Sequence, residues 1–178
     1  MLQLEHANST LGTSRTDHPI NSGWVRRCFG EAALRSVSGR SVICSGTIFG
    51  TPAGFASLAR GYSATRCLRR ADGIDQGVLN YLVHSHSELL GGTTVELQPR
   101  GQGAVNALQP FKLVPLGELR AHMSPEGIVL DDDGGPSAVV HQFDRLVPLG
   151  VQFGALQGYS LRCLDKKEAG CRTYARAG

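Results

Sequence analysis

The stretch Val42-Ile-Cys-Ser-Gly-Thr-Ile-Phe-Gly-Thr-Pro52, followed by Asp72-Gly-Ile-Asp-Gln-Gly-Val-Leu-Asn-Tyr-Leu-Val-His84, carries the strongest pattern in the chain. Its first half reads as a short apolar strand that runs into a turn of small residues and then a helix start. Its second half reads as a polar helix N-terminus followed by an apolar helical face. Two such junctions close together are how α/β proteins build sites at the ends of strands. The stretch therefore predicts an α/β fold.

The composition narrows the class of protein. The chain has 178 residues, of which 41% are hydrophobic and 19% charged, which predicts a globular domain with a sizeable core. The net charge of +3 is spread thinly, without a basic stripe interleaved with aromatic residues, so nucleic acid is not an expected partner. The five cysteines are irregularly spaced and form no Cys-x-x-Cys pair, which favours free buried thiols in a reducing compartment.

Targeting signals are not evident in the sequence. No apolar run approaches the ~20 residues that span a bilayer, and the N-terminus lacks a basic segment followed by an apolar one. We therefore expect a soluble protein without a signal peptide or transmembrane segment in this chain, and the compartment stays open.

Local patterns predict the remaining elements. Thr51-Pro52 is a clear helix start, because threonine accepts a hydrogen bond from an orphan amide and proline needs no amide hydrogen there. Asp131 to Gly135 predicts a tight turn, since aspartate and glycine tolerate the left-handed backbone that such turns need. The expected helices are a fragment over Met1–Leu11, a helix capped by Asn21 or Ser22 that runs to about Val37 and stops at Gly39, and a helix that begins at Asp75. The expected strands are a buried strand at Ser41–Cys44, a strand at Phe111–Leu116, and hairpin arms at Gly127–Leu130 and Ala138–His141. A glycine-rich mobile connection is expected at Leu90–Gly103.

Two polar groups flank the predicted strand and helix. Ser45, Gly46 and Thr47 follow the strand, where small residues let a ligand approach the backbone and hydroxyls can donate; a tight connection to the next helix would use the same residues. Asp75 and Gln76 place a carboxylate and an amide at the positive end of a helix dipole, where they can hold sugar hydroxyls. A plain N-cap role for Asp75 is the alternative, and on spacing alone it is favoured.

Two later features could bind metal. His141 follows an apolar strand and could bind a divalent cation, although a structural role is commoner for a lone histidine. Asp131-Asp132-Asp133 follows an apolar run, as the Asp-x-Asp motif of many sugar transferases does, but it continues into Gly134-Gly135 and another strand. That continuation favours a turn over a metal and nucleotide site.

Four segments together resemble a known family. They are Asn21-Ser22-Gly23-Trp24 with Cys28-Phe29-Gly30, Cys44-Ser45-Gly46-Thr47-Ile48-Phe49-Gly50-Thr51, Asp75-Gln76-Gly77-Val78-Leu79-Asn80, and Val140-His141-Gln142-Phe143-Asp144-Arg145. In this order they resemble the later, acceptor-side half of glycosyltransferases of the GT-A-like type, over about two-thirds of the chain. The N-terminal nucleotide-binding half with its Asp-x-Asp motif is expected to be missing, as in a truncated or degenerate copy.

The resemblance implies transfer of a hexose from a nucleotide sugar to a carbohydrate or glycan acceptor. It implies catalytic roles for Asp75 and Gln76, substrate contacts for Ser45, Gly46, Thr47 and Asn80, and a metal ligand at His141 for Mn²⁺ or Mg²⁺. A non-catalytic carbohydrate-binding or interaction module is the alternative.

The fold implied by the resemblance is a partial GT-A-like, Rossmann-related α/β domain with short strands, flanking helices and a C-terminal β-hairpin. The expected division is an N-terminal extension or truncated helix at 1–20, a glycosyltransferase-like domain at 21–146 and a flexible tail at 147–178.

Overall fold

The computed structural model describes residues 1–4, 10–14, 17–65, 67, 74–99, 101–102, 105–107, 123–126 and 128–141. The chain divides into two compact units, Met1–Arg100 and Gly101–Gly178. Helices and short strands alternate in the first unit, as a small α/β fold predicts. The predicted strand at Phe111–Leu116 and the predicted tail at 147–178 lie outside the described residues.

The first unit contains a three-stranded sheet. Strands β1 (Leu2–Leu4), β2 (Ile43–Ile48) and β3 (Leu97–Gln98) lie in the order β2-β1-β3, with β1 antiparallel to β2 and parallel to β3. The helix predicted over Met1–Leu11 is therefore wrong at β1, because pairing with two distant segments overrides the local pattern. The mobile connection predicted at Leu90–Gly103 is likewise wrong where it contains β3.

Strand β2 is longer than the sequence predicts. The strand was expected to end at Cys44, with Ser45, Gly46 and Thr47 in a turn beyond it. Instead these three residues lie inside β2, and Ile48 still pairs with Leu2. The correction matters for the site, because a strand holds these residues more rigidly than a turn would.

Helix α1 (Pro19–Ser36) begins two residues before Asn21, the first of the two predicted caps. His18 caps it, since its Nδ1 accepts from the Asn21 backbone N–H at 3.3 Å, and proline follows in the first turn. Asn21 and Ser22 are therefore helical rather than capping. At Gly30 the backbone has φ 88°, which interrupts the helix, and Gly39 adopts φ 75° just beyond its end, where the sequence predicts a stop.

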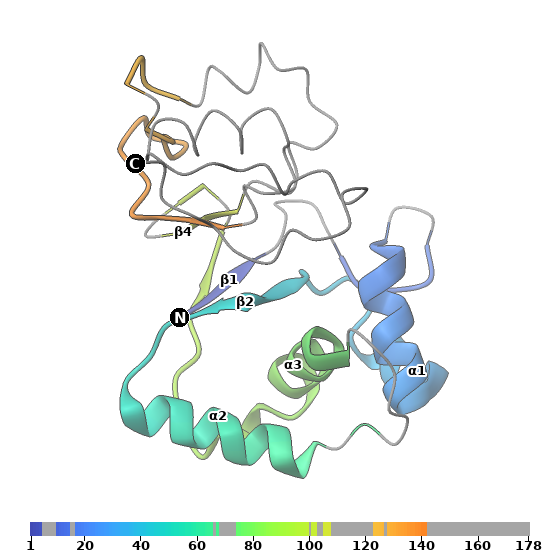
Figure 1. Cartoon of the computed structure of the whole chain (residues 1–178). Helices are drawn as coiled ribbons and strands as arrows, with labels where there is room; N and C mark the ends of the chain where they lie inside the picture. Colours follow the sequence, from blue (N-terminus) through green and yellow to red (C-terminus); the bar gives the residue numbers. More distant parts are fainter. Residues whose placement is uncertain are drawn as a thin grey trace, which may run out of the picture. The chain divides into compact units, whose positions relative to one another are not determined.

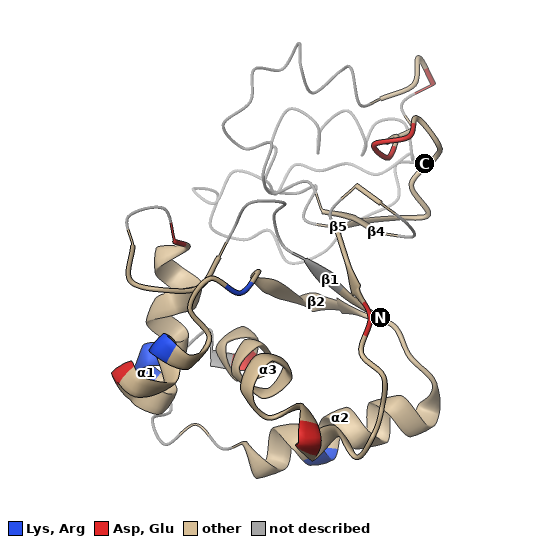
Figure 2. Cartoon of the chain, turned by 180° about the vertical axis from the view of Figure 1, so that it is seen from behind, with Lys and Arg blue, Asp and Glu red and all other residues tan. Residues whose placement is uncertain are grey.

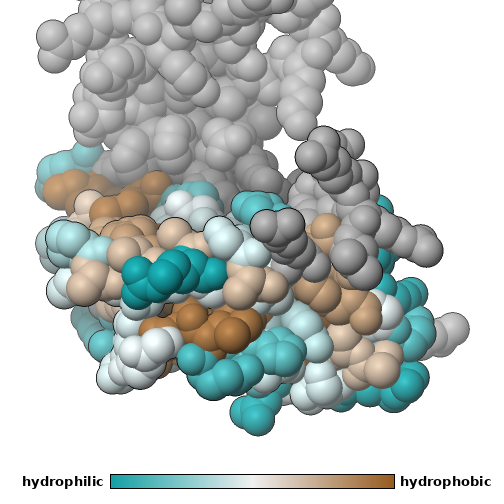
Figure 3. All heavy atoms as spheres, turned by 90° about the horizontal axis from the view of Figure 1, so that it is seen from below, coloured by the Kyte–Doolittle hydropathy of each residue, from teal (hydrophilic) through white to brown (hydrophobic). Residues whose placement is uncertain are grey.

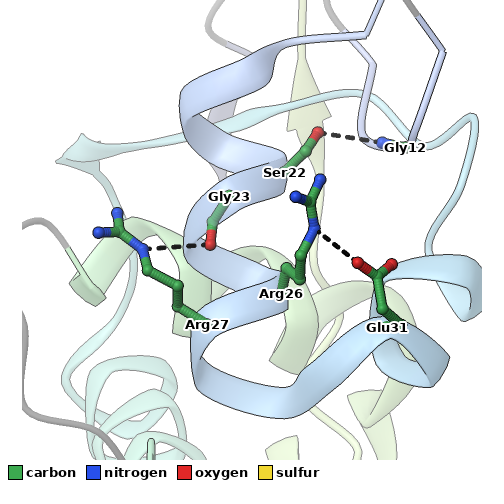
Figure 4. A network of polar contacts seen from close by, with 6 residues as sticks. All are labelled: Gly12, Ser22, Gly23, Arg26, Arg27 and Glu31. Carbon is green, nitrogen blue, oxygen red and sulfur yellow. Dashed lines mark hydrogen bonds and ion pairs between the residues drawn. The ribbon is translucent and has the colours of Figure 1, made fainter.

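Helix α1 carries polar contacts along its exposed and inner sides (Figure 4). Ser22 Oγ accepts from the Gly12 backbone N–H at 3.1 Å, which ties the preceding loop to the helix. Arg26 and Glu31 form an ion pair at 3.0 Å across the interruption at Gly30. Both side chains are about half exposed, so the pair contributes little to stability. Figure 2 marks the charged positions along α1, and the burial of these residues shows that all of them are exposed.

Helix α2 (Pro52–Ala64) confirms the predicted helix start. Thr51 Oγ1 accepts from the Gly54 backbone N–H at 3.1 Å, and Pro52 occupies the first turn. Helix α3 (Ile74–Ser85) has Asp75 in its first turn, and a short 3₁₀ helix, η1 (Ser87–Leu90), follows it. Figure 1 shows α3 between strand β2 and helix α2, with α1 beside it.

Two buried clusters form the core of the first unit. One joins α1 to the start of β2, and the other joins the sheet to α3. Their fully buried members are Leu11, Val25, Leu34, Val37 and Val42 in the first cluster, and Leu2, Ile43 and Leu79 in the second. Helices α1 and α3 approach closely at Gly77, where a Cβ atom would lie 2.8 Å from Trp24 Cβ. Only glycine fits there.

The second unit contains a parallel pair of strands, β4 (Val105–Ala107) and β5 (Val139–His141). The predicted turn is confirmed: Asp131 Oδ1 accepts from the backbone N–H groups of Asp133 and Gly135 at 3.0 and 2.7 Å, and Gly134 has φ 81°. A bridge between Leu130 and Pro136 closes the turn. The predicted hairpin is wrong in its second arm, because Val139–His141 pairs with β4.

Cys28 and Cys67 form a disulfide that links α1 to the segment between α2 and α3. The expectation of free thiols is wrong for this pair, whereas Cys44 is buried and takes no part in it. The two cysteines are 39 residues apart, so the bond closes a long loop.

We expect reduction of this disulfide to destabilise the protein. The 39-residue separation gives about 4 kcal/mol in the chain-entropy description of disulfides. Guanidinium unfolding, followed by fluorescence of Trp24, measures the change with and without reductant. The double variant Cys28→Ala/Cys67→Ala is the control, since it should start at the lower stability and lose most of its response to reductant. Equal midpoints for the oxidised and reduced wild-type protein would contradict this expectation.

Candidate functional site

Predicted site residues from two separate segments of the sequence lie next to each other in the first unit. Ser45, in the middle of β2, donates its hydroxyl to Asp75 Oδ2 at 2.9 Å. Asp75 lies in the first turn of α3 and its side chain is exposed, whereas Ser45 is partly buried. The contact places a carboxylate and a hydroxyl side by side at the surface. Both groups can exchange hydrogen bonds with a polar ligand.

The side chain of Gln76 supports the contact between Ser45 and Asp75 from inside the protein. Its Oε1 accepts from the Ser45 backbone N–H at 3.2 Å, and its Nε2 donates to Asn21 Oδ1 at 2.7 Å. The Gln76 side chain is only 9% exposed, so its amide joins β2 to α1 inside the protein. The backbone position of Ser45 is thus fixed by a buried side chain from α3.

Asn80 continues the same connection one helical turn later. Its Oδ1 accepts from the Ile43 backbone N–H at 2.8 Å, while its Nδ2 donates to the carbonyls of Ile43 and Gln76 at 2.9 and 2.7 Å. Both Ile43 and Asn80 are fully buried. Among the described strands β2 lies at the edge of its sheet, and these amides satisfy the backbone groups on the edge that faces away from β1.

The spacing of the two amides matches the strand. Four residues of an α-helix rise about 6 Å, and two residues of a β-strand rise about 6.7 Å. Gln76 and Asn80 therefore reach Ser45 and Ile43 in turn, with α3 running antiparallel to β2. We call Gln76 and Asn80 the amide clamp. Its sequence signal is a pair of amides four residues apart on an otherwise apolar helix face.

The predicted site residues thus fall into two groups. Asp75, Ser45 and Gly46 reach the surface, while the side chains of Gln76 and Asn80 are used inside the protein. Thr47 is 9% exposed, and its Oγ1 has no hydrogen-bond partner in the described part of the chain. The register of β2 against β1 shifts between Ile43 and Ile48, so regular alternation does not place Thr47 on the face of Ser45.

Tyr62 of α2 supports the start of α3. Its hydroxyl donates to the Asp75 backbone carbonyl at 2.6 Å. Burial raises the pKa of Tyr62, and the nearby Asp75 charge raises it further. The phenol therefore stays protonated and keeps this bond throughout the physiological pH range.

The histidines at the end of α3 contact different groups. His84 Nε2 lies 2.9 Å from the Ser41 carbonyl, and burial lowers the pKa of His84 although this hydrogen bond opposes the shift. His86 Nδ1 lies 2.9 Å from Glu88 Oε1 instead. The neutral form of His84 donates from Nε2 and joins α3 to Ser41, two residues before β2.

His141 is the last residue of β5 in the second unit. Among the described residues, no three His, Cys, Asp or Glu side chains are grouped so that they could hold a metal ion. The described residues therefore do not build a metal site around His141, and its predicted ligand role stays a prediction. Asp144 lies outside the described residues.

A cavity of about 250 Å³ also lies in the first unit, at the N-terminal end of α2. None of the predicted site residues lines it. The sequence gives little indication of this cavity. Phe55 and Leu58 have the pattern of ordinary apolar positions in a helix, and Phe49 that of an apolar residue between a strand and a helix.

Comparison with known proteins gave no match to a family model, to a curated protein or to a solved structure. The resemblance to glycosyltransferases therefore stays a prediction. Within the described ranges, no helix combines the length and apolar character that crossing a membrane requires.

We expect Asn80→Ala to destabilise the protein by about 2–4 kcal/mol, because it leaves the buried N–H and C=O of Ile43 without partners. Chemical denaturation of the purified variant measures the loss. Ser85→Ala, on the exposed end of the same helix, is the matched control and should change stability little. A loss for Asn80→Ala as small as that of the control would refute the clamp.

Proposed function

We propose that the first unit carries the sugar-contacting surface of a hexosyltransferase of the GT-A-like type, and that Asp75 and Ser45 form that surface. The observation that carries the proposal is the 2.9 Å contact between the exposed Asp75 carboxylate and the Ser45 hydroxyl. Two segments 30 residues apart in the sequence supply these groups. Their resemblance to glycosyltransferase motifs suggested the same residues independently of the structure.

The chemistry of the pair suits a sugar. Sugar hydroxyls both donate and accept hydrogen bonds, and a carboxylate accepts while a serine hydroxyl does both. Hydrogen bonds to a charged group are stronger than neutral ones, so Asp75 would provide most of the affinity. The exposed Gly46 beside Ser45 leaves room for a ring to approach the strand.

The amide clamp supports the proposal because its hydrogen bonds hold the backbone of the proposed binding groups in place. A binding group is most effective when buried hydrogen bonds fix its position before the ligand arrives. Gln76 holds the backbone of Ser45, and Tyr62 holds the backbone of Asp75. Gln76 and Asn80 would then be positioning residues, and Asp75 would be the group that touches substrate.

Transfer of a hexose would need a donor site as well. In the proposed reaction an acceptor hydroxyl oxygen bonds to the anomeric carbon and its proton passes to the Asp75 carboxylate. The bond to the nucleoside diphosphate breaks, and the diphosphate leaves with the electron pair. Mn²⁺ or Mg²⁺ would stabilise the charge on that leaving group. His141 is the residue we propose as a metal ligand. A non-catalytic carbohydrate-binding module would need only the Asp75 and Ser45 surface.

Calorimetric titration with UDP and GDP, with and without Mn²⁺, tests the donor site. We expect one nucleotide to bind only with the metal and His141→Ala to abolish that binding. His86→Ala is the control, because it removes an exposed histidine of the first unit and should leave binding unchanged. If neither nucleotide binds to a folded protein, the transferase is refuted and the carbohydrate-binding module remains.

Saturation-transfer NMR with methyl hexosides tests the sugar surface itself. We expect Asp75→Asn and Ser45→Ala each to weaken binding of the preferred hexoside about tenfold, since the first removes the charge and one acceptor oxygen and the second removes a hydroxyl. Glu31→Gln is the matched control, because it neutralises another exposed carboxylate of the same unit. Unchanged affinity in both site variants would remove the sugar role from this surface.

A further inference from the structure

The cavity at the N-terminal end of α2 has a chemistry different from that of the Asp75 surface. It measures about 250 Å³ and is lined mainly by apolar side chains. Those that matter here are Leu2, Ile48, Phe49, Phe55, Leu58 and Val95. They come from β1, from the end of β2 and the residues after it, from α2, and from the segment before β3. The cavity therefore depends on the packing of α2 and the segment before β3 against the sheet.

Size and lining restrict what the cavity can hold. Pockets for drug-sized ligands have volumes of roughly 300–1,000 Å³, so this one suits a smaller molecule, about the size of a single ring. No charged side chain lines it, but Met1 belongs to the lining and its α-amino group donates to the Phe49 carbonyl at 2.9 Å. A charged ligand would lose its hydration in this mainly apolar lining, and a cation would gain no ionic partner there, which favours a neutral ligand.

Aromatic side chains add a preference for a flat ring. Phe49 is 41% exposed and Phe55 is 45% exposed, although both line the cavity. Aromatic rings attract one another in offset or edge-on arrangements. Figure 3, which views the first unit from the side of α2, shows apolar residues reaching the surface among polar ones.

Polar groups in the lining are hydroxyls. Thr51, Thr93 and Thr94 contribute them, and Thr51 Oγ1 accepts from the Gly54 N–H and so keeps its own proton for a ligand. A ligand with one hydrogen-bonding group beside its ring would match this lining. A small number of polar groups in an apolar pocket fixes the orientation of a ligand and contributes less to its affinity.

We propose that this cavity is a binding site for a small, neutral, ring-bearing molecule with a single hydroxyl or carbonyl group. The site is separate from the proposed sugar surface. Gly54 lies in the first turn of α2, whereas Tyr62, which contacts Asp75, lies in its last turn, about 12 Å further along the helix axis.

Titration of the full chain with benzyl alcohol, followed by two-dimensional amide NMR, tests this site. We expect saturable shifts centred on Gly54, Phe55 and Thr93. Benzylamine has the same ring but is cationic at neutral pH, so we expect it to bind at least tenfold more weakly. Absence of saturable shifts at these residues, or equal binding of the two compounds, would overturn the proposal.

A matched pair of variants makes the test specific. A Cβ atom at Gly54 would lie 3.4 Å from Thr51 Oγ1 and 3.8 Å from Thr93 Cγ2, so Gly54→Leu grows a side chain among the lining residues. A Cβ atom at Gly23 of α1 meets nothing within 4 Å, so Gly23→Leu makes the same change away from the cavity. Both changes replace a helical glycine by a better helix former. We expect Gly54→Leu alone to weaken benzyl alcohol binding at least tenfold, and equal effects of the two variants would overturn the proposal.

Discussion

The packing of the first unit depends on hydrogen bonds to the backbone N–H and C=O groups along the edge of β2 that faces α3. Ile43 is fully buried, and its backbone N–H and C=O face helix α3 rather than another strand. A buried backbone N–H or C=O without a hydrogen-bond partner lowers the free energy of unfolding, so side chains must supply the partners on this edge of the strand. Asn80 does so with both ends of its amide, and Gln76 repeats the arrangement at Ser45. This constraint fixes the distance, direction and rotation of α3 against the sheet.

The position of α3 then determines the arrangement of its neighbours. Gln76 donates to Asn21, which brings α1 against α3, and Gly77 permits the close approach to Trp24. The disulfide between Cys28 and Cys67 joins α1 to the chain that leads into α3. Buried polar networks of this kind are stabilising only when every member is paired, and the amide hydrogens of Asn80 and its oxygen all have partners.

The same constraint links the fold to the proposed function. Asp75 directly precedes the first residue of the amide clamp, so the exposed carboxylate sits on a backbone held by buried hydrogen bonds. Ser45 is held from the strand side by Gln76. A rigid pair at the surface above a satisfied interior suits recognition of a polyhydroxyl ligand. The apolar cavity near the other end of α2 offers a different chemistry, so one small unit can present two independent binding surfaces.

Features that rest on local chemistry could be predicted from the sequence. Thr51-Pro52 begins α2 and Asp131 to Gly135 turns the chain, because cap and turn residues act on backbone groups within a few positions. The resemblance between motifs also selected Asp75, Gln76, Ser45 and Asn80, which the structure brings together. Other features depend on partners far away in the sequence, which no local pattern encodes. For this reason the strand β1, the pairing of Val139–His141 with β4 and the bond between Cys28 and Cys67 became visible only in the folded chain. The inward orientation of Gln76 and Asn80 has the same cause, since their partners lie in β2 and α1.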